Sequence, residues 1–273
     1  MAVVDFADYL RYIVNTKYKG GQTMEKVIAE KLKEIEKKQG VNIILAVESG
    51  SRAWGFASPD SDYDVRFIYY RPKNEYLRLD DRRDVIELPI NDLLDINGWD
   101  LDKALKLLYK SNPTLFEWLS SPIVYKSESE IEAIKSIAND YFSIKKGLYH
   151  YLSMAKSNYR EYLKTETVRA KKYFYVLRPI LACRWILNKG TPPPMLFSEL
   201  MDSELDKSLI PFVNELLDVK MNSPEIKEIK KMQPVNDYIE NSLEELQQRI
   251  DETPVDYNED WSTLNNLFLK IIE

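Results

Sequence analysis

The chain has 273 residues, of which 44% are hydrophobic and 30% are charged, a composition that excludes a disordered chain. Its net charge of −6 excludes a protein that coats nucleic acid with a strongly basic surface. No apolar run approaches the ~18 residues that a membrane helix needs, and the first residues lack a signal-peptide pattern, so we expect no membrane partner. A single cysteine, Cys183, excludes internal disulfides, and we expect it to pack inertly in the core of a cytoplasmic protein.

The first half of the chain alternates between helical and strand patterns. Helical spacing of apolar residues predicts a helix over residues 5–18 and a second over 23–40, which ends on lysines and Gly40. Residues 98–110 return to helical spacing. Between them, short apolar runs predict strands at residues 41–47, 63–70 and 84–90, with a shorter one at 93–97.

The second half is predicted to be almost entirely helical. A proline run at residues 191–194 is typical of a loop inside this half rather than of a domain boundary. Because the strands cluster before the helices, the sequence predicts an α+β fold. We expect a small mixed-sheet domain over residues 1–126 and a helical domain over residues 127–273.

The segment from Val47 to Tyr70 carries the densest chemical signal. A Gly50-Ser51 pair follows one predicted strand, and Asp62 and Asp64 stand at the start of the next. Side chains on a strand alternate between faces, so these two acids point the same way and repel each other unless a cation lies between them. Carboxylate oxygens are the preferred ligands of Mg²⁺, and a glycine-serine turn suits a phosphate group.

Three other interpretations of this segment compete with a metal site. A calcium loop fails because Val65 stands where glycine is required, and a phosphate-binding P-loop fails because no Gly-Lys-Ser/Thr follows Gly50. A polar turn at a strand entrance stays open for the acids alone. A single histidine, His150, leaves no two-histidine metal site, and a packed or surface role on a helix is expected for it.

The complete string "GSRAWGFASPDSDYDVRFIY" resembles the signature of the DNA polymerase β-type nucleotidyltransferase superfamily. Together with "DINGWDLDKALKLL" and "SNPTLFEWLSSPIVY", it is similar to the RNA-ligase-associated, YcgL-like subfamily of predicted nucleotidyltransferases. The resemblance is strong over residues 41–125, and "KKYFYVLRPILACRW" extends it into the helical half. It implies a palm-like catalytic domain.

The resemblance also implies roles for individual residues. Gly50 and Ser51 would contact the nucleotide's phosphates, and Asp62 and Asp64 would bind two Mg²⁺ ions, with Mn²⁺ as an alternative. A third carboxylate would complete the metal site and activate the acceptor hydroxyl. Asp95, in a predicted strand, is preferred for this third carboxylate to Asp100, which begins a helix and suits a capping role. Asp92 is a weaker candidate.

Basic and aromatic residues supply candidates for substrate contact. Arg52 and Arg66 suit phosphate contact, although a structural ion pair is an equal alternative for an arginine among acids. Lys172 and Arg178, in a basic-aromatic run, suit a triphosphate or an RNA backbone, against an ordinary solvated helix face. Trp54 could border the base or anchor the loop, and so could Phe56.

The leading hypothesis is a Mg²⁺-dependent nucleotidyltransferase that moves a nucleoside monophosphate from an NTP to a hydroxyl. The acceptor stays open among an RNA end, a small molecule and a protein, and the oligomeric state is not predicted. The alternative is a non-catalytic nucleotide- or RNA-binding module of the same fold.

Overall fold

The computed structural model describes residues 22–89, 93–223, 227–256 and 258–273, and it combines a mixed sheet with a layer of long helices. The sheet order is β3-β4-β2-β1-β5, with β2 and β4 parallel and the other pairs antiparallel. The strands are β1 (Asn42–Ser49), β2 (Tyr63–Tyr70), β3 (Val85–Glu87), β4 (Leu94–Asp100) and β5 (Val124–Ser127). The predicted α+β class is therefore confirmed.

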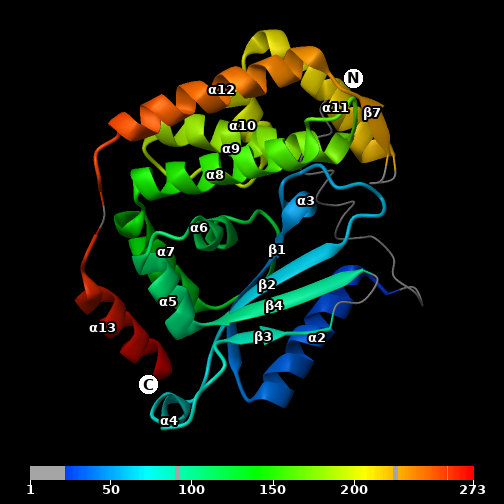
Figure 1. Cartoon of the computed structure of the whole chain (residues 1–273). Helices are drawn as coiled ribbons and strands as arrows, with labels where there is room; N and C mark the ends of the chain where they lie inside the picture. Colours follow the sequence, from blue (N-terminus) through cyan, green and yellow to red (C-terminus); the bar gives the residue numbers. More distant parts are fainter. Residues whose placement is uncertain (1–21, 90–92, 224–226, 257) are drawn as a thin grey trace.

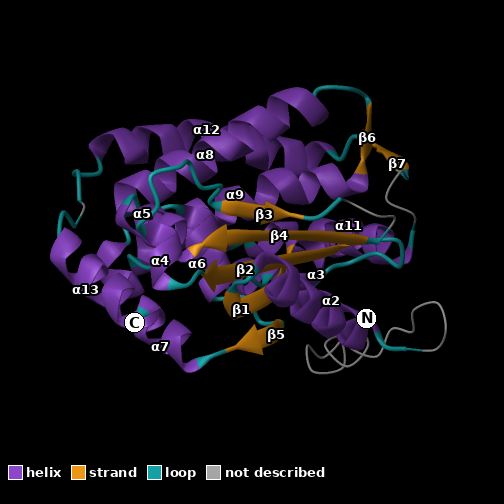
Figure 2. Ribbon diagram, turned by 90° about the horizontal axis from the view of Figure 1, so that it is seen from below, coloured by secondary structure: helices purple, strands orange, loops and turns teal. Residues whose placement is uncertain are grey.

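Helices cover both faces of the sheet because alternate strand residues are apolar on each side. Val65 and Phe67 pack with α2 (Met24–Gln39) on one face, and Ile68 packs with α5 (Leu101–Tyr109) on the other. Figure 2, which is seen from below, shows α2 in front of the strands. Three more helices share the α5 side, namely α6 (Pro113–Leu119), α7 (Ser129–Ala138) and α13 (Trp261–Ile272).

The helical half forms around one buried helix. Figure 1 shows α8 (Ile144–Tyr162), α9 (Ala170–Lys189) and α12 (Gln233–Glu252) running together above the sheet. Most of α9 is buried, including Cys183. Two further helices, α10 (Phe197–Glu204) and α11 (Ile210–Asn222), pack against the same core, and the chain also forms short 3₁₀ turns at η1 (Asn139–Tyr141) and η2 (Lys207–Leu209).

One loop of the sheet half belongs to the core of the helical half. This loop, residues 54–61, follows the short helix α3 (Gly50–Ala53) and leads into β2. The Phe56 side chain is 1% exposed and packs on Phe174 and Phe197, with ring centroids 4.8 and 5.5 Å away. The backbone amide of Phe197 donates to the carbonyl of Trp54 at 3.0 Å. Phe56 therefore anchors the loop.

Two sequence-based expectations are corrected. A helix predicted to begin at Gly98 begins only at Leu101, because β4 continues to Asp100. Gly98 lies under the Phe67 ring, and a Cβ atom at position 98 would come within 2.1 Å of a carbon of that ring. The helical half also contains an antiparallel strand pair. It consists of β6 (Thr167–Arg169) and β7 (Glu228–Lys230).

Other expectations have mixed outcomes. Residues 191–194 connect α9 to α10, as predicted for the proline loop. The helix expected over residues 5–18 lies outside the described residues, as does Asp92. Across the described part of the chain, no helix has the length and apolar character needed to cross a membrane. The domain division at residue 126 stays a prediction.

Candidate active site

The acids Asp64 and Asp95 lie side by side on neighbouring parallel strands. They are register partners in the β2–β4 pair, and both side chains lie opposite to Val65 and Ile96, which pack towards α2. Asp62 stands one residue before the first residue of β2. Two of the three predicted metal ligands therefore share one sheet face, and the third stands at its edge.

The guanidinium of Arg66 bridges these two carboxylates. Its Nη2 atom lies 3.0 Å from Oδ1 of Asp64 and 2.7 Å from Oδ2 of Asp95. The Asp64 and Asp95 side chains are 30% and 32% exposed, so the pair is only partly shielded from water. Arg66 therefore has the ion-pair role that sequence reasoning weighed against phosphate contact, and it reduces the repulsion between the two acids.

Gly50 lies close to the side chain of Asp64. It has a φ of 61°, which favours glycine, and a Cβ atom at this position would lie 2.2 Å from Oδ2 of Asp64. Ser49 is the register partner of Asp64 on β1, and Ser51 follows in the first turn of α3. The Gly50 backbone and the Asp64 side chain therefore lie in close contact.

A buried acid beneath the site was missed by sequence reasoning. Glu48 is fully buried in β1, and its carboxylate accepts hydrogen bonds from the Asp64 amide at 2.8 Å and from the Tyr125 hydroxyl at 2.5 Å. Burial raises the pKa of the Glu48 carboxyl to about 8, although these two hydrogen bonds oppose the shift. Glu48 therefore fixes the backbone that carries Asp64.

Arg52 lies under the site rather than at its surface. It is 4% exposed, and its guanidinium donates to the carbonyls of Ser61 at 2.6 Å and of Asp62 at 3.0 Å. The same guanidinium lies 3.7 Å from the ring centroid of Tyr63. These contacts place Arg52 against the backbone that leads into β2.

Asp100 lies at the opposite end of β4 from Asp95 and has a different environment. It caps α5 by accepting from the Asp102 amide at 3.5 Å, as predicted for a helix start. It is also fully buried, and its carboxylate contacts the Tyr76 hydroxyl at 2.7 Å and Nε of Arg71 at 3.2 Å. Tyr76 lies in α4 (Lys73–Tyr76). The structure thus groups Asp95, and not Asp100, with Asp64.

Arg178, one of the two basic residues chosen from α9, lines a small cavity. This cavity, of about 150 Å³, is lined by Trp54, Tyr175 and Arg178, and the Trp54 and Tyr175 rings meet edge to face with centroids 6.0 Å apart. Arg178 is 3% exposed, and its Nη1 atom donates to Oε1 of Glu117 at 2.8 Å. The ammonium of Lys172 lies 4.8 Å from the ring centroid of Tyr175. Nucleotide contact by either basic residue stays a prediction.

The carboxylates suit a divalent cation by their chemistry. Within the described residues, no group of three His, Cys, Asp or Glu side chains is close enough to hold a metal ion. Burial raises the pKa of the Asp64 carboxyl, Arg66 opposes this rise, and the carboxylates of Asp95 and Asp62 add to it. A site where neighbouring negative charges disfavour ionisation fits a hard cation with oxygen ligands.

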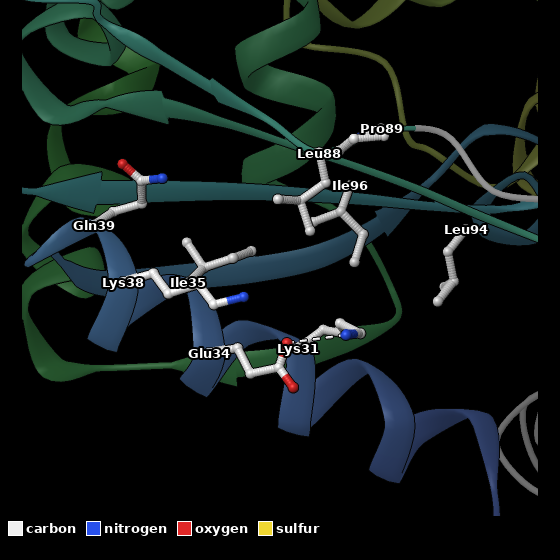
Figure 3. Close-up of a pocket in the computed structure, with 9 residues that line it drawn as sticks. All are labelled: Lys31, Glu34, Ile35, Lys38, Gln39, Leu88, Pro89, Leu94 and Ile96. Carbon is white, nitrogen blue, oxygen red and sulfur yellow. Dashed lines mark hydrogen bonds and ion pairs between the residues drawn. The ribbon is translucent and has the colours of Figure 1, made fainter.

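A separate groove lies on the other face of the sheet. Figure 3 shows it between α2 and the β3–β4 edge, lined by Lys31 and Ile35 from the helix and by Leu88 and Ile96 from the strand side. Its volume is about 310 Å³. Because Ile96 and Asp95 alternate along β4, this groove is not part of the acid site.

Known proteins resemble this chain over most of its length. A sequence model described as the RNA repair pathway DNA polymerase beta family matches residues 24–270. "Uncharacterized protein YcgL" of Bacillus subtilis (strain 168) is 45% identical over 252 residues, which cover 92% of this chain and 97% of that protein. A solved nucleotidyltransferase-like protein from Exiguobacterium sibiricum 255-15 is 12% identical, with a TM-score of 0.30 over 89% of this chain and 79% of that chain.

Proposed function

Since the chain belongs to the RNA repair pathway DNA polymerase beta family, we propose that it is a nucleotidyltransferase that moves a nucleoside monophosphate from an NTP to an acceptor hydroxyl with the help of Mg²⁺. The observation that carries this proposal is the pairing of Asp64 with Asp95 beside the Gly50-Ser51 turn. Acids next to a turn that admits close approach suit the metal-bound triphosphate of an NTP.

In this proposal Asp62, Asp64 and Asp95 would hold the cations. When bound, two Mg²⁺ ions would lower the pKa of the acceptor hydroxyl and neutralise the leaving pyrophosphate, and Mn²⁺ has a suitable coordination chemistry to replace them. The proposed reaction forms a bond between the acceptor oxygen and the α-phosphorus and breaks the bond from that phosphorus to the bridging oxygen. Pyrophosphate leaves, and Asp95 accepts the hydroxyl proton.

The remaining residues of the site would position the substrate. Ser51 and the backbone of Gly50 would contact the phosphates, and Arg66 would exchange its contact with Asp95 for a contact with the NTP. Arg52 would act on phosphate only through the loop that it holds, because its guanidinium is buried against the carbonyls of Ser61 and Asp62. Such a reaction requires mainly positioning and charge stabilisation, so no histidine is needed.

The family description supports an RNA end as the acceptor. Purified protein with labelled NTPs, Mg²⁺ and total RNA is expected to release pyrophosphate and to label the RNA, whereas the Asp62→Asn variant should do neither. Pyrophosphate release with a small molecule or a protein, and not with RNA, would keep the reaction and change the acceptor. The fold of the variant is checked by circular dichroism.

A non-catalytic binding module is the second candidate. The observation that favours it is the Arg66 guanidinium, which already contacts both acids where cations would bind. This candidate predicts NTP binding that is independent of Mg²⁺, and no pyrophosphate from wild-type protein with any acceptor. Calorimetric titration of NTP with and without Mg²⁺ separates the two candidates.

A further inference from the structure

A buried lysine of the helical half contacts the loop that leads to Asp62. Lys220 lies near the end of α11 and is 4% exposed. Its Nζ atom donates to Oγ of Ser58 at 2.8 Å and lies 3.4 Å from Oγ of Ser61. These contacts join residues that are 162 and 159 positions apart in the sequence.

The two serines form a compact turn that is held from both sides. The Ser61 amide donates to the Ser58 carbonyl at 3.1 Å, and the Ser58 amide donates to Oγ of Ser61 at 3.0 Å. Lys220 binds the hydroxyl side of this turn, while Arg52 binds the Ser61 and Asp62 carbonyls. Two buried cations, one from each half of the protein, therefore hold the turn.

This arrangement bears on Asp62 more than on the other acids. Asp64 and Asp95 lie within paired strands, so their backbones are fixed by the sheet. Asp62 precedes β2, and its position follows from the turn before it. Burying an ammonium group is costly even when it is hydrogen-bonded, so the lysine is a poor choice for stability alone. The Lys220 ammonium is better explained if the Ser58–Ser61 turn must keep one conformation.

We propose that Lys220 is a positioning residue: from the helical half, its ammonium fixes the Ser58–Ser61 turn and thereby sets the place of the Asp62 carboxylate in the site. This inference rests on the proposed function for its consequence in catalysis. The contact itself is independent of that function, so the two are tested separately.

The test compares Lys220→Met, which removes the charge but keeps the length, with Lys220→Arg, which keeps the charge. Lys207→Met is the matched control, because Lys207 is an exposed lysine of the same half. We expect amide hydrogen exchange across residues 58–64 to be about tenfold faster in Lys220→Met, with α12 unchanged. Lys207→Met should exchange like wild type, and Lys220→Arg should lie near it.

The kinetic measurement is the Mg²⁺ dependence of nucleotidyl transfer. We expect Lys220→Met to need about tenfold more Mg²⁺ for half-maximal turnover and to lose about 10²-fold in kcat, because a ligand displaced by about 1 Å has this scale of effect. At saturating Mg²⁺ the KM for NTP should stay near wild type, since Gly50 and Ser51 are untouched. Ser61→Ala should weaken turnover in the same way, and less than additively with Lys220→Met.

The outcomes distinguish the two proposals. Unchanged exchange over residues 58–64 and unchanged Mg²⁺ dependence in Lys220→Met would overturn the positioning role, even if transfer is observed. A loss of thermal stability in Lys220→Met without either local effect would also overturn it, in favour of packing alone. If wild-type protein transfers no nucleotide, the proposed function fails, and the exchange measurement then decides the positioning contact by itself.

Discussion

The Gly50 backbone lies against the carboxylate of Asp64 so closely that a Cβ atom at position 50 would stand 2.2 Å from Oδ2. The positive φ of Gly50 adds a second constraint, because an L-residue in this conformation costs about 1–2 kcal/mol. Both constraints act where the proposed phosphate and metal contacts meet.

We therefore expect Gly50→Ala to displace Asp64 from Arg66 and to lower turnover by at least about 10²-fold, a scale typical of displaced catalytic groups. Gly40→Ala is the control, since Gly40 has a similar φ of 62° and open space at its Cβ position. Steady-state kinetics and thermal unfolding of both variants provide the measurement. Equal loss of turnover in the two variants would mean that backbone strain alone is responsible.

Asp95 and Asp100 are expected to respond differently to substitution. Asp95→Asn should lower turnover by several orders of magnitude and leave NTP affinity nearly intact, because the acceptor hydroxyl loses its proton acceptor. Asp100→Asn should instead lower the free energy of unfolding by about 3–5 kcal/mol, since Asp100 is fully buried and paired with Arg71. Single-turnover kinetics and urea unfolding measure the two effects, and a reversed pattern would move the catalytic role to Asp100.

Glu48 is expected to make stability depend on pH. Its pKa is raised from 4.5 to about 8 in the folded protein, so the folded state holds a proton that the unfolded state releases above pH 4.5. The free energy of unfolding should therefore fall as the pH rises from about 4.5 to about 8. The raised pKa of Asp64 acts in the same direction.

Urea unfolding of metal-free protein across this pH range provides the measurement. Glu48→Gln should fall less steeply than wild type and should be the more stable of the two at pH 8, because its side chain stays neutral. Glu132→Gln is the control, since it removes an exposed acid and leaves Glu48 in place. The lowered pKa of His150 acts in the opposite direction in both proteins, so the difference between their profiles is the test, and a Glu48→Gln profile as steep as that of wild type would contradict the assignment of a protonated Glu48.

The Glu117–Arg178 pair is expected to link the sheet half to the helical half. Arg178 is 3% exposed, and Glu117 also accepts a hydrogen bond from the Tyr151 hydroxyl at 2.9 Å. Removing the guanidinium leaves the largely buried Glu117 carboxylate without its cation, with only the Tyr151 hydrogen bond named above to offset the loss, so Arg178→Met should lower the free energy of unfolding by about 3–5 kcal/mol. The double variant with Glu117→Gln should lose less than the sum of the single losses in a double-mutant cycle.

Lys172 is expected to report on RNA contact. Its ammonium lies over the rings of Tyr162 and Tyr175, at 3.5 and 4.8 Å from their centroids. Contacts with phosphates release counterions, so the affinity for single-stranded RNA falls as the salt concentration rises. In Lys172→Ala the slope of log affinity against log salt concentration should become less steep by about one. Lys189→Ala, at the exposed end of the same helix, should leave the slope unchanged. Equal slopes in all three proteins would indicate that this run is a solvated face.

The sheet side of the site could be predicted from sequence because its pattern is local. Alternation along a strand places Asp62, Asp64 and Arg66 in phase, and the spacing from Gly50 carries the family resemblance. The choice of Asp95 over Asp100 as the neighbour of Asp64 agrees with the β2–β4 register. Its catalytic role stays a prediction.

The supporting residues escaped prediction because their partners are distant in sequence. Glu48 stands at the end of an apolar run, where an acid gives no sign that it is buried. Lys220 did give a signal: with Val213 and Leu216 it completes a helical stripe at spacings of three and four residues, so it falls on the buried face of α11. Its partner was not predictable, because the contact with Ser58 depends on how the two halves pack.

The anchoring of residues 54–61 limits how the sequence between Ser51 and Asp62 can change in length. Phe56 is inserted in a packed core, and the turn that follows it is held by Lys220 and Arg52. An inserted or deleted residue would displace either Phe56 or Asp62, since both ends of the loop are held by packed or hydrogen-bonded contacts. Surface loops usually tolerate such changes in length, whereas we expect this loop to require its present number of residues.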